Sequence, residues 1–307
     1  MPHDIVILGI FVADAAFRCD QLPRLGETLL GTGFTLGPGG KGSNQAVAAA
    51  MAGGDVGFLT RIGDDTFGAM GRETWAGAGV HPLAVIDDSL PTGAAGIFVE
   101  TGTAKNAIVV SPGAAGAIGA ADVEAQAEAI RRARVALTQL EQPMAAAEAF
   151  LRMAREGGAI TILNPAPAAA LPQGMLALCD YLTPNEAEAE GLTGLAVTDR
   201  DSAARAAGAL LEQGVGKAVI VTLGGDGALV RDADGARHVP PMSAGPAVDT
   251  TGAGDAFNGG FATALAEGQT LDAALRFATA VAAISVTRAG AAAAMPTRAE
   301  VEALLAG

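Results

Sequence analysis

The stretch Asp249–Gly260, with the sequence DTTGAGDAFNGG, combines a glycine-rich turn, a carboxylate and the start of an apolar helix. Glycines at Gly252 and Gly254, with Ala253 between them, let the backbone approach a ligand and direct successive N–H groups at one spot. A helix N-terminus adds positive potential, so the turn suits an anion such as phosphate. Because Asp255 would repel that anion, we interpret it as a base acting beside a phosphate. Taken alone, the aspartate could instead be an ordinary helix N-cap.

A second glycine-rich loop, GPGGKG at residues 37–42, also leads into a predicted helix. It matches G-x-G-x-x-G, but Thr60 and Arg61 stand where a dinucleotide site needs an acid, and the Walker A pattern fails as well. A dinucleotide-dependent oxidoreductase therefore has this loop as its only support. The remaining interpretations are a structural turn, or a loop in which Lys41 and Asn44 donate hydrogen bonds to an oxygen-rich ligand.

Acidic residues follow two predicted strands. Asp14 comes just after an apolar run at Asp4–Ile10, and Glu141 ends a predicted strand at Val135–Leu140. Ligands of open α/β sheets bind beyond the carboxyl ends of the strands, so these carboxylates could hydrogen-bond substrate hydroxyls. For Asp14 a simple turn aspartate is the alternative.

Two further segments offer groups for a metal ion or a phosphate. Asn185 and Glu188 lie three residues apart on a helix predicted to begin near Pro184, so both face one side and suit Mg²⁺. An ordinary solvated acidic helix start is the alternative. The sequence TLGGDG at Thr222–Gly227 offers small side chains and free N–H groups for phosphate or purine contacts, although a tight hairpin explains its glycines equally well.

Strands and helices alternate along the chain, which predicts an α/β fold. Further strands are predicted at Val56–Arg61 and Ala159–Leu163. Short β-rich segments at Thr28–Leu36 and Thr92–Val110, the second a hairpin with its turn at Thr101–Ala104, predict a small separate sheet that covers the site as a lid. We expect one domain over residues 1–307, with lid segments at about 11–38 and 91–110. The predicted helices include a helix through Trp75, Asp122–Arg132, Ala145–Arg155, Ser202–Gln213, Leu271–Val286 and Arg298–Leu305.

Composition and charge argue against a nucleic-acid-binding surface, a membrane-binding surface and a disulfide-rich fold. The chain has 307 residues, half of them hydrophobic, and a net charge of −14, which argues against a nucleic-acid or anionic-membrane surface but not against ATP. Cys19 and Cys179 are too few for a disulfide framework or a thiolate metal site. The start, MPHDIVILGI, lacks the basic region of a secretory signal, so we expect a cytoplasmic location.

Five motifs, in this order along nearly the whole chain, resemble those of the ribokinase-like family of carbohydrate kinases. They are GGKGSNQAVAA at Gly39–Ala49, NPAPA at Asn164–Ala168, TPNEAEAE at Thr183–Glu190, TLGGDG at Thr222–Gly227 and DTTGAGDAFNGG at Asp249–Gly260. The resemblance implies a three-layer α/β/α sandwich with a mostly parallel central sheet and a small β-sheet lid, which often forms a dimer interface. It also implies transfer of phosphate from ATP to a sugar hydroxymethyl, with Mg²⁺ and K⁺ as cofactors.

The resemblance further assigns roles to residues. Asp255 is the base, and Gly252, Ala253 and Gly254 form the anion hole. Sugar contacts match Asp14, Gly40, Lys41, Asn44, Glu141 and Asp255. Nucleotide contacts match Asn185, Thr222, Gly224, Gly227, Gly254 and Thr279. Mg²⁺ matches Asn185 and Glu188, and K⁺ matches Asp249, Thr251, Ser285, Arg288 and Gly290, several of them through backbone carbonyls.

Three positions depart from the family pattern. Val12 stands where the ribose kinases usually have Asn, so one hydrogen bond to the sugar is missing. Thr279 replaces a His or Asn that commonly meets adenine, and Ala294 replaces a serine of the cation site. Ribose, converted to ribose 5-phosphate, is the leading substrate. A nucleoside kinase is the runner-up, because the lost contact at Val12 could accompany a bulkier or less hydroxylated ligand, and deoxyribose or a hexose are the other acceptors. A non-catalytic sugar or nucleotide sensor is the alternative from a different class of protein.

Overall fold

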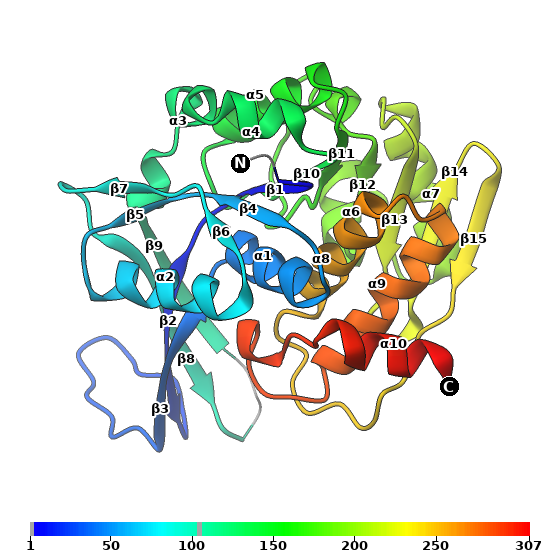
Figure 1. The fold of residues 1–307 in the computed structure, drawn as a ribbon. Coiled ribbons are helices and arrows are strands. Elements are labelled where there is room, and N and C mark those ends of the chain that lie inside the picture. Colours follow the sequence, from blue (N-terminus) through cyan, green and yellow to red (C-terminus); the bar gives the residue numbers. More distant parts are fainter. Residues whose placement is uncertain (1–2, 103–105) are drawn as a thin grey trace.

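A nine-stranded sheet forms the centre of the computed structural model, which describes residues 3–102 and 106–307 (Figure 1). Seven neighbouring strands of the sheet, β13, β12, β11, β10, β1, β4 and β6, pair in parallel. Strand β14 pairs antiparallel with β13 and with β15, so the sheet is mostly parallel, as predicted. Across the sheet the order is β15 (Gly235–Val239), β14 (Ala228–Asp232), β13 (Ala218–Thr222), β12 (Tyr181–Leu182), β11 (Ile160–Leu163), β10 (Val135–Thr138), β1 (Ile5–Leu8), β4 (Val56–Leu59) and β6 (His81–Pro82).

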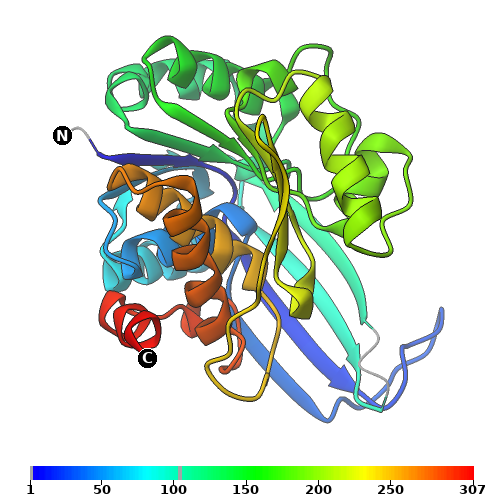
Figure 2. The ribbon, with the colours of Figure 1, turned by 90° about the vertical axis from the view of Figure 1, so that its right-hand side faces the viewer.

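Helices cover both faces of this sheet, which confirms the three-layer sandwich (Figure 2). Side chains alternate along a strand, so Ile5 and Ile7 of β1 pack into one layer while Val6 and Leu8 pack into the other. The first layer contains α1 (Lys41–Met51), α2 (Thr66–Ala78), α8 (Ala253–Ala266), α9 (Leu271–Ser285) and α10 (Arg298–Ala306). The second contains α3 (Ala120–Ala125), α4 (Ala127–Arg132), α5 (Met144–Glu156), α6 (Glu186–Thr193) and α7 (Arg200–Glu212). Single turns of 3-10 helix are η1 (Ala114–Ala117), η2 (Leu176–Leu178), η3 (Gly224–Asp226) and η4 (Ala292–Ala294).

A separate four-stranded sheet projects from one end of the molecule (Figures 1 and 2). Its order is β3 (Gly33–Gly39), β2 (Val12–Cys19), β8 (Thr92–Glu100) and β9 (Asn106–Gly113). The pairing of β8 with β9 is antiparallel, which confirms the predicted hairpin. The turn predicted at Thr101–Ala104 runs into residues 103–105, which lie outside the described part of the chain.

Several predicted boundaries were wrong. The local pattern predicts no strand at residues 12–19, and the strand predicted at Thr28–Leu36 begins only at Gly33. The backbone of β2 is held by two partners, β3 and β8, and such pairing is not visible in a local pattern. The strand predicted at Val56–Arg61 divides into β4 and β5 (Arg61–Gly63), and β5 pairs with β7 (Val85–Asp87). The predicted helix Asp122–Arg132 divides at Gln126, whose backbone is not helical.

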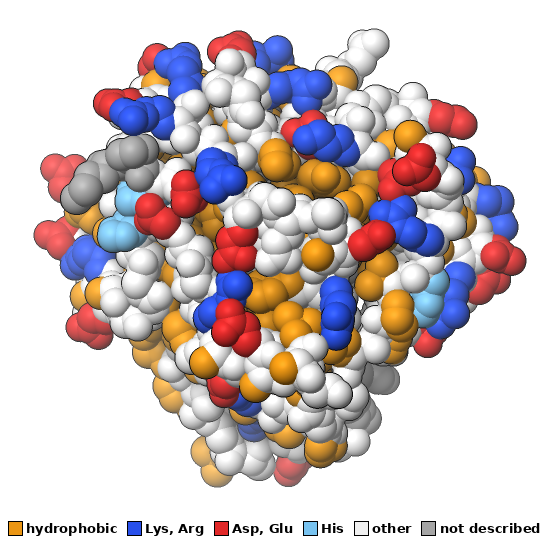
Figure 3. All heavy atoms as spheres, turned by 45° about the vertical axis from the view of Figure 1, so that its right-hand side comes forward, with side chains coloured by type: hydrophobic (Ala, Val, Ile, Leu, Met, Phe, Trp, Pro, Cys, Tyr) orange, Lys and Arg blue, Asp and Glu red, His pale blue; other side chains and the backbone are white. Residues whose placement is uncertain are grey.

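The surface carries Lys or Arg side chains close to Asp or Glu side chains, and no continuous basic patch is visible on the face drawn in Figure 3. Within residues 3–102 and 106–307, no helix is both long enough and apolar enough to cross a membrane.

Candidate active site

Asp255 lies in the first turn of α8 and is 6% exposed. The Nδ2 of Asn44 donates to its Oδ2 at 3.1 Å, and the Nε2 of Gln45 donates to its Oδ1 at 3.0 Å. The helix starts at Ala253 after Gly252, an N-cap without a side-chain hydrogen bond, so the alternative of Asp255 as N-cap is wrong. Burial raises the pKa of Asp255, and the charge of Lys41 and both side-chain donors oppose that rise.

Close packing of α8 on α1 sets the position of this carboxylate. Four residues after Asp255, a Cβ on Gly259 would lie 2.6 Å from the Cβ of Ala48. Four residues further, the hydroxyl of Thr263 donates to the carbonyl of Ala49 at 3.0 Å. Residues spaced by four share a helix face, so one face of α8 carries the carboxylate, the glycine contact and the hydrogen bond to α1.

The first turn of α1 packs closely against the residues that follow β1. A Cβ on Gly9 would lie 2.6 Å from the Cα of Gly42, so only glycine allows this approach. Gly40 has φ 88°, and a Cβ there would lie 2.5 Å from the carbonyl oxygen of Ile10. These contacts bring Lys41 to the carboxyl edge of the parallel strands, where ligands of such sheets bind.

Two further carboxylates face this edge. Glu141 accepts a 2.7 Å hydrogen bond from the backbone N–H of Lys41. Burial raises the pKa of Glu141 to about 7, and the charges of Asp255 and Asp14 contribute, while Lys41 lowers it. Burial also raises the pKa of Asp14 to about 6. The structure therefore brings the predicted sugar-binding residues together with the predicted base.

Asn185 and Glu188 form a reciprocal capping box at the start of α6. The N–H of Glu188 donates to the Oδ1 of Asn185 at 2.8 Å, and the N–H of Asn185 donates to the Oε2 of Glu188 at 2.9 Å. Glu188 is buried, so the alternative of a solvated acidic helix start does not describe it. Burial raises the pKa of Glu188, the N–H of Asn185 and the charge of Lys41 lower it, and the charge of Asp255 raises it.

A cavity of about 300 Å³ opens beside the start of α8. Small or apolar groups, among them Phe257 and Met242, form much of its wall. Asn185 pairs with Thr222 through a β-bridge at its margin. Such a wall suits a flat aromatic ring, and the glycines leave room for phosphate. Residues predicted to contact the nucleotide line this cavity, namely Thr222, Gly224, Gly227, Gly254 and Thr279.

The residues predicted for a monovalent cation are only partly brought together. Asp249 accepts hydrogen bonds from the N–H groups of Thr251 and Gly290, both at 2.9 Å. The Ser285 hydroxyl instead donates to the carbonyl of Ala282 in its own helix. The Arg288 guanidinium pairs with Glu300. The Arg288 guanidinium is positively charged, so this residue could contribute a cation ligand only through its backbone carbonyl.

A chain of buried amide and hydroxyl groups behind Asp255 was missed from the sequence. The Nε2 of Gln45 also donates to the Oδ1 of Asn164 at 3.1 Å, and the Nδ2 of Asn164 donates to the carbonyl of Thr183 at 2.8 Å. The Thr183 hydroxyl donates to the Oδ1 of Asn258 at 2.6 Å, and the Nδ2 of Asn258 donates to the carbonyl of Gly254 at 2.8 Å. Gln45 directly follows Asn44 in the glycine-loop motif, and that adjacency was the available signal.

Similarity to known proteins identifies the family of the chain. The sequence profile of the pfkB family carbohydrate kinases matches residues 2–298. The chain belongs to this family. It is 39% identical to a ribokinase of Haemophilus influenzae over 301 residues, covering 98% of this chain and 97% of that one. It is 36% identical to a deoxyribokinase of Salmonella typhi over 294 residues, 94% of each chain.

Solved structures agree as well. The structure of Arabidopsis thaliana ribokinase in complex with ribose and ATP has a TM-score of 0.93 to this chain at 31% identity, with 99% of each chain covered. The predicted ribokinase-like α/β fold, with its small second sheet, is therefore confirmed.

Proposed function

We propose that this protein transfers the γ-phosphoryl group of ATP to the primary hydroxyl of a pentose, with ribose giving ribose 5-phosphate as the leading reaction. The observation that carries the proposal is the position of Asp255. Its buried carboxylate directly follows Gly254, which lines the cavity beside α8, and its charge acts on Glu141, the residue that accepts a hydrogen bond from Lys41. A base placed between a nucleotide and a sugar is the arrangement that phosphoryl transfer requires.

In the proposed reaction the sugar hydroxyl loses its proton to Asp255 while its oxygen bonds to the γ-phosphorus, and the bond from that phosphorus to the bridging oxygen of ADP breaks. Hydrogen bonds from Asn44 and Gln45 hold the carboxylate in place. The N–H groups at the start of α8 stabilise the transferring group, Gly254 foremost. The N–H of Ala253 also donates to the carbonyl of Thr250 at 3.2 Å, so it is the weaker donor of the two.

Asp14, Gly40, Lys41, Asn44 and Glu141 are the proposed sugar contacts. The half-buried carboxylates of Asp14 and Glu141 can accept hydrogen bonds from sugar hydroxyls, and Lys41 and Asn44 supply donors. Val12 lies two residues before Asp14 on β2, so both side chains point to the same face of the small sheet. Val12 is buried against Gly93 and offers the sugar no polar atom. This apolar contact is the observation that favours a less hydroxylated sugar such as deoxyribose, or a nucleoside, as the alternative acceptor.

Asn185 and Glu188 are the proposed ligands of Mg²⁺, directly or through water. A buried carboxylate close to the charge of Asp255 fits a divalent cation, because the cation relieves repulsion that is otherwise offset by the N–H of Asn185 and the charge of Lys41. When bound, Mg²⁺ supplies positive charge that neutralises the phosphates. For K⁺, we propose the loop held by Asp249, with carbonyl ligands from its neighbours.

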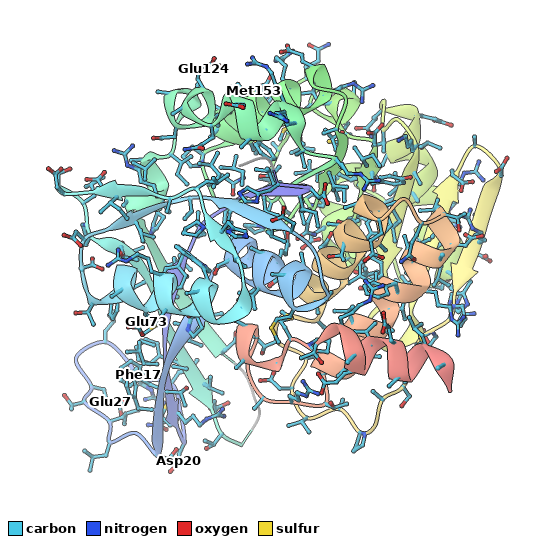
Figure 4. The ribbon with its side chains drawn as sticks, in the orientation of Figure 1. Phe17, Asp20, Glu27, Glu73, Glu124 and Met153 are labelled. Atoms are coloured by element: carbon cyan, nitrogen blue, oxygen red, sulfur yellow. The ribbon has the colours of Figure 1, made fainter. Side chains whose placement is uncertain are left out.

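The small sheet is the proposed lid over the sugar. Its face opposite to Asp14 carries exposed apolar side chains, among them Phe17 (42% exposed; Figure 4) and Phe34 (57% exposed). Their rings lie 4.9 Å apart. A patch of this kind favours association with a second copy, so we propose a homodimer through the lids. Phe34→Glu should convert the dimer to a monomer in sedimentation; a monomeric unmodified protein contradicts the dimer.

Sugar-dependent release of ADP from ATP tests the whole proposal, with ribose, deoxyribose, hexoses and nucleosides compared as acceptors. Ribose should give the highest kcat/KM. Turnover with nucleosides alone would favour the nucleoside kinase, and no turnover with any acceptor would favour a non-catalytic sensor. Asp255→Asn should lower kcat by at least about 10³-fold while ATP binding, measured by calorimetry, persists. Unchanged activity in that variant refutes Asp255 as the base.

A further inference from the structure

A second group of side chains with metal-binding chemistry lies at the amino ends of strands in the central sheet, away from the proposed active site. His3 precedes β1, Asp55 precedes β4, and His81 begins β6. Strand β4 is the parallel neighbour of both β1 and β6, so the amino ends of the three strands lie side by side. The proposed active site occupies the carboxyl ends of the same sheet. This group is therefore separate from the sugar and nucleotide contacts.

The three potential ligand atoms converge. The Nδ1 of His3 lies 2.8 Å from the Oδ1 of Asp55, and the Nε2 of His81 lies 3.6 Å from the same oxygen. All three atoms lie within 4.8 Å of one another. Ligands of a tetrahedral zinc ion, each about 2.0–2.1 Å from the metal, are about 3.3 Å apart. Only small side-chain rotations therefore separate the observed arrangement from a metal site.

The fold holds one ligand in place and leaves the others room to adjust. The His3 ring lies over Gly57, where a Cβ would approach its Cδ2 to 2.8 Å, and the ring is 8% exposed. Its other neighbour is the His81 ring, stacked at 4.7 Å between centroids. Asp55 and His81 are exposed at 46% and 61%, so their side chains can rotate toward an ion.

The types of ligand indicate the class of metal. Two imidazole nitrogens with one carboxylate oxygen suit Zn²⁺ and its neighbours Ni²⁺ and Cu²⁺, whereas Mg²⁺ prefers oxygen ligands alone. We propose that His3, Asp55 and His81 bind one divalent transition-metal ion of this class. The ion replaces the proton shared by His3 and Asp55 and leaves a fourth position to water. Because it joins three separate segments, it stabilises the folded chain.

Calorimetry of chelator-treated protein without a histidine tag, titrated with ZnCl₂, tests this site. We expect one Zn²⁺ per chain at this site and a rise in Tm that is lost in His81→Ala. Any rise with MgCl₂ should be the same in His81→Ala and the unmodified protein, because Mg²⁺ prefers oxygen ligands alone. His81→Ala and Asp55→Asn each remove one exposed ligand and should weaken Zn²⁺ binding by at least about 10-fold. His238→Ala, which removes the third histidine of the chain, is the matched control and should bind as the unmodified protein does.

Sugar-dependent turnover with Mg²⁺ should be the same in His81→Ala and Asp55→Asn as in the unmodified protein, which shows that both variants are folded. Two outcomes overturn the proposal. One is the absence of Zn²⁺ binding to the unmodified protein. The other is equal binding by His81→Ala and the unmodified protein, which would place the ion elsewhere, for example among the active-site carboxylates.

Discussion

Replacing Glu141 with Gln should stabilise the protein at pH 8. The pKa of Glu141 is raised from 4.5 to about 7, mainly by burial, so ionising this carboxyl costs more in the folded chain than in the unfolded chain. Gln has no charge to bury, and its carbonyl can still accept the hydrogen bond from the N–H of Lys41. The variant therefore removes the cost and keeps the contact.

The size and sign of the effect follow from the two pKa values. Below pH 4.5 the carboxyl is protonated in both states, so the variant and the unmodified protein should be equally stable. Between pH 4.5 and pH 7 only the unfolded chain releases the proton, and the stability of the unmodified protein falls. Above pH 7 the full difference is present, up to about 3 kcal/mol at about 1.4 kcal/mol for each pKa unit.

Urea unfolding without ligands, at intervals from pH 4.5 to pH 8.5, measures the difference in the free energy of unfolding. Glu124→Gln is the matched control, because Glu124 is an exposed glutamate on α3 (Figure 4), and its effect should vary little with pH. An effect of Glu141→Gln that is the same at both ends of the range would refute the reasoning. So would a variant that is less stable than the unmodified protein at pH 8.

Two further changes test the positioning of Asp255. Gly40→Ala should lower the free energy of unfolding by about 1–3 kcal/mol and abolish turnover, because φ is 88° at this position and the added Cβ would meet the Ile10 carbonyl. Gly37 has open space around it, so Gly37→Ala is the control and should change neither the free energy of unfolding nor turnover. Gln45→Glu should move the acid limb of the pH–kcat profile to higher pH, because Asp255 loses a donor and gains a charged neighbour; an unmoved limb contradicts this coupling.

Much of the site could be predicted from local patterns. The motif around Asp255 joins a glycine turn to a helix, and its physical demands are visible within a dozen residues. Strand periodicity likewise placed Glu141 and Asn164 after strand ends, where parallel sheets bind their ligands. Both inferences depend only on residues that are neighbours along the chain.

Long-range packing decided the rest. Gln45 and Asp255 are 210 positions apart, and their hydrogen bond exists because Gly259 lets α8 approach α1. The strand β2 exists because two partners pair with it, and His3 meets His81 only because β4 lies between their strands. The sequence by itself therefore determined the class of chemistry and the alternation of strands and helices. Only the tertiary structure decided which buried groups touch, because those contacts depend on helix and strand packing between distant segments.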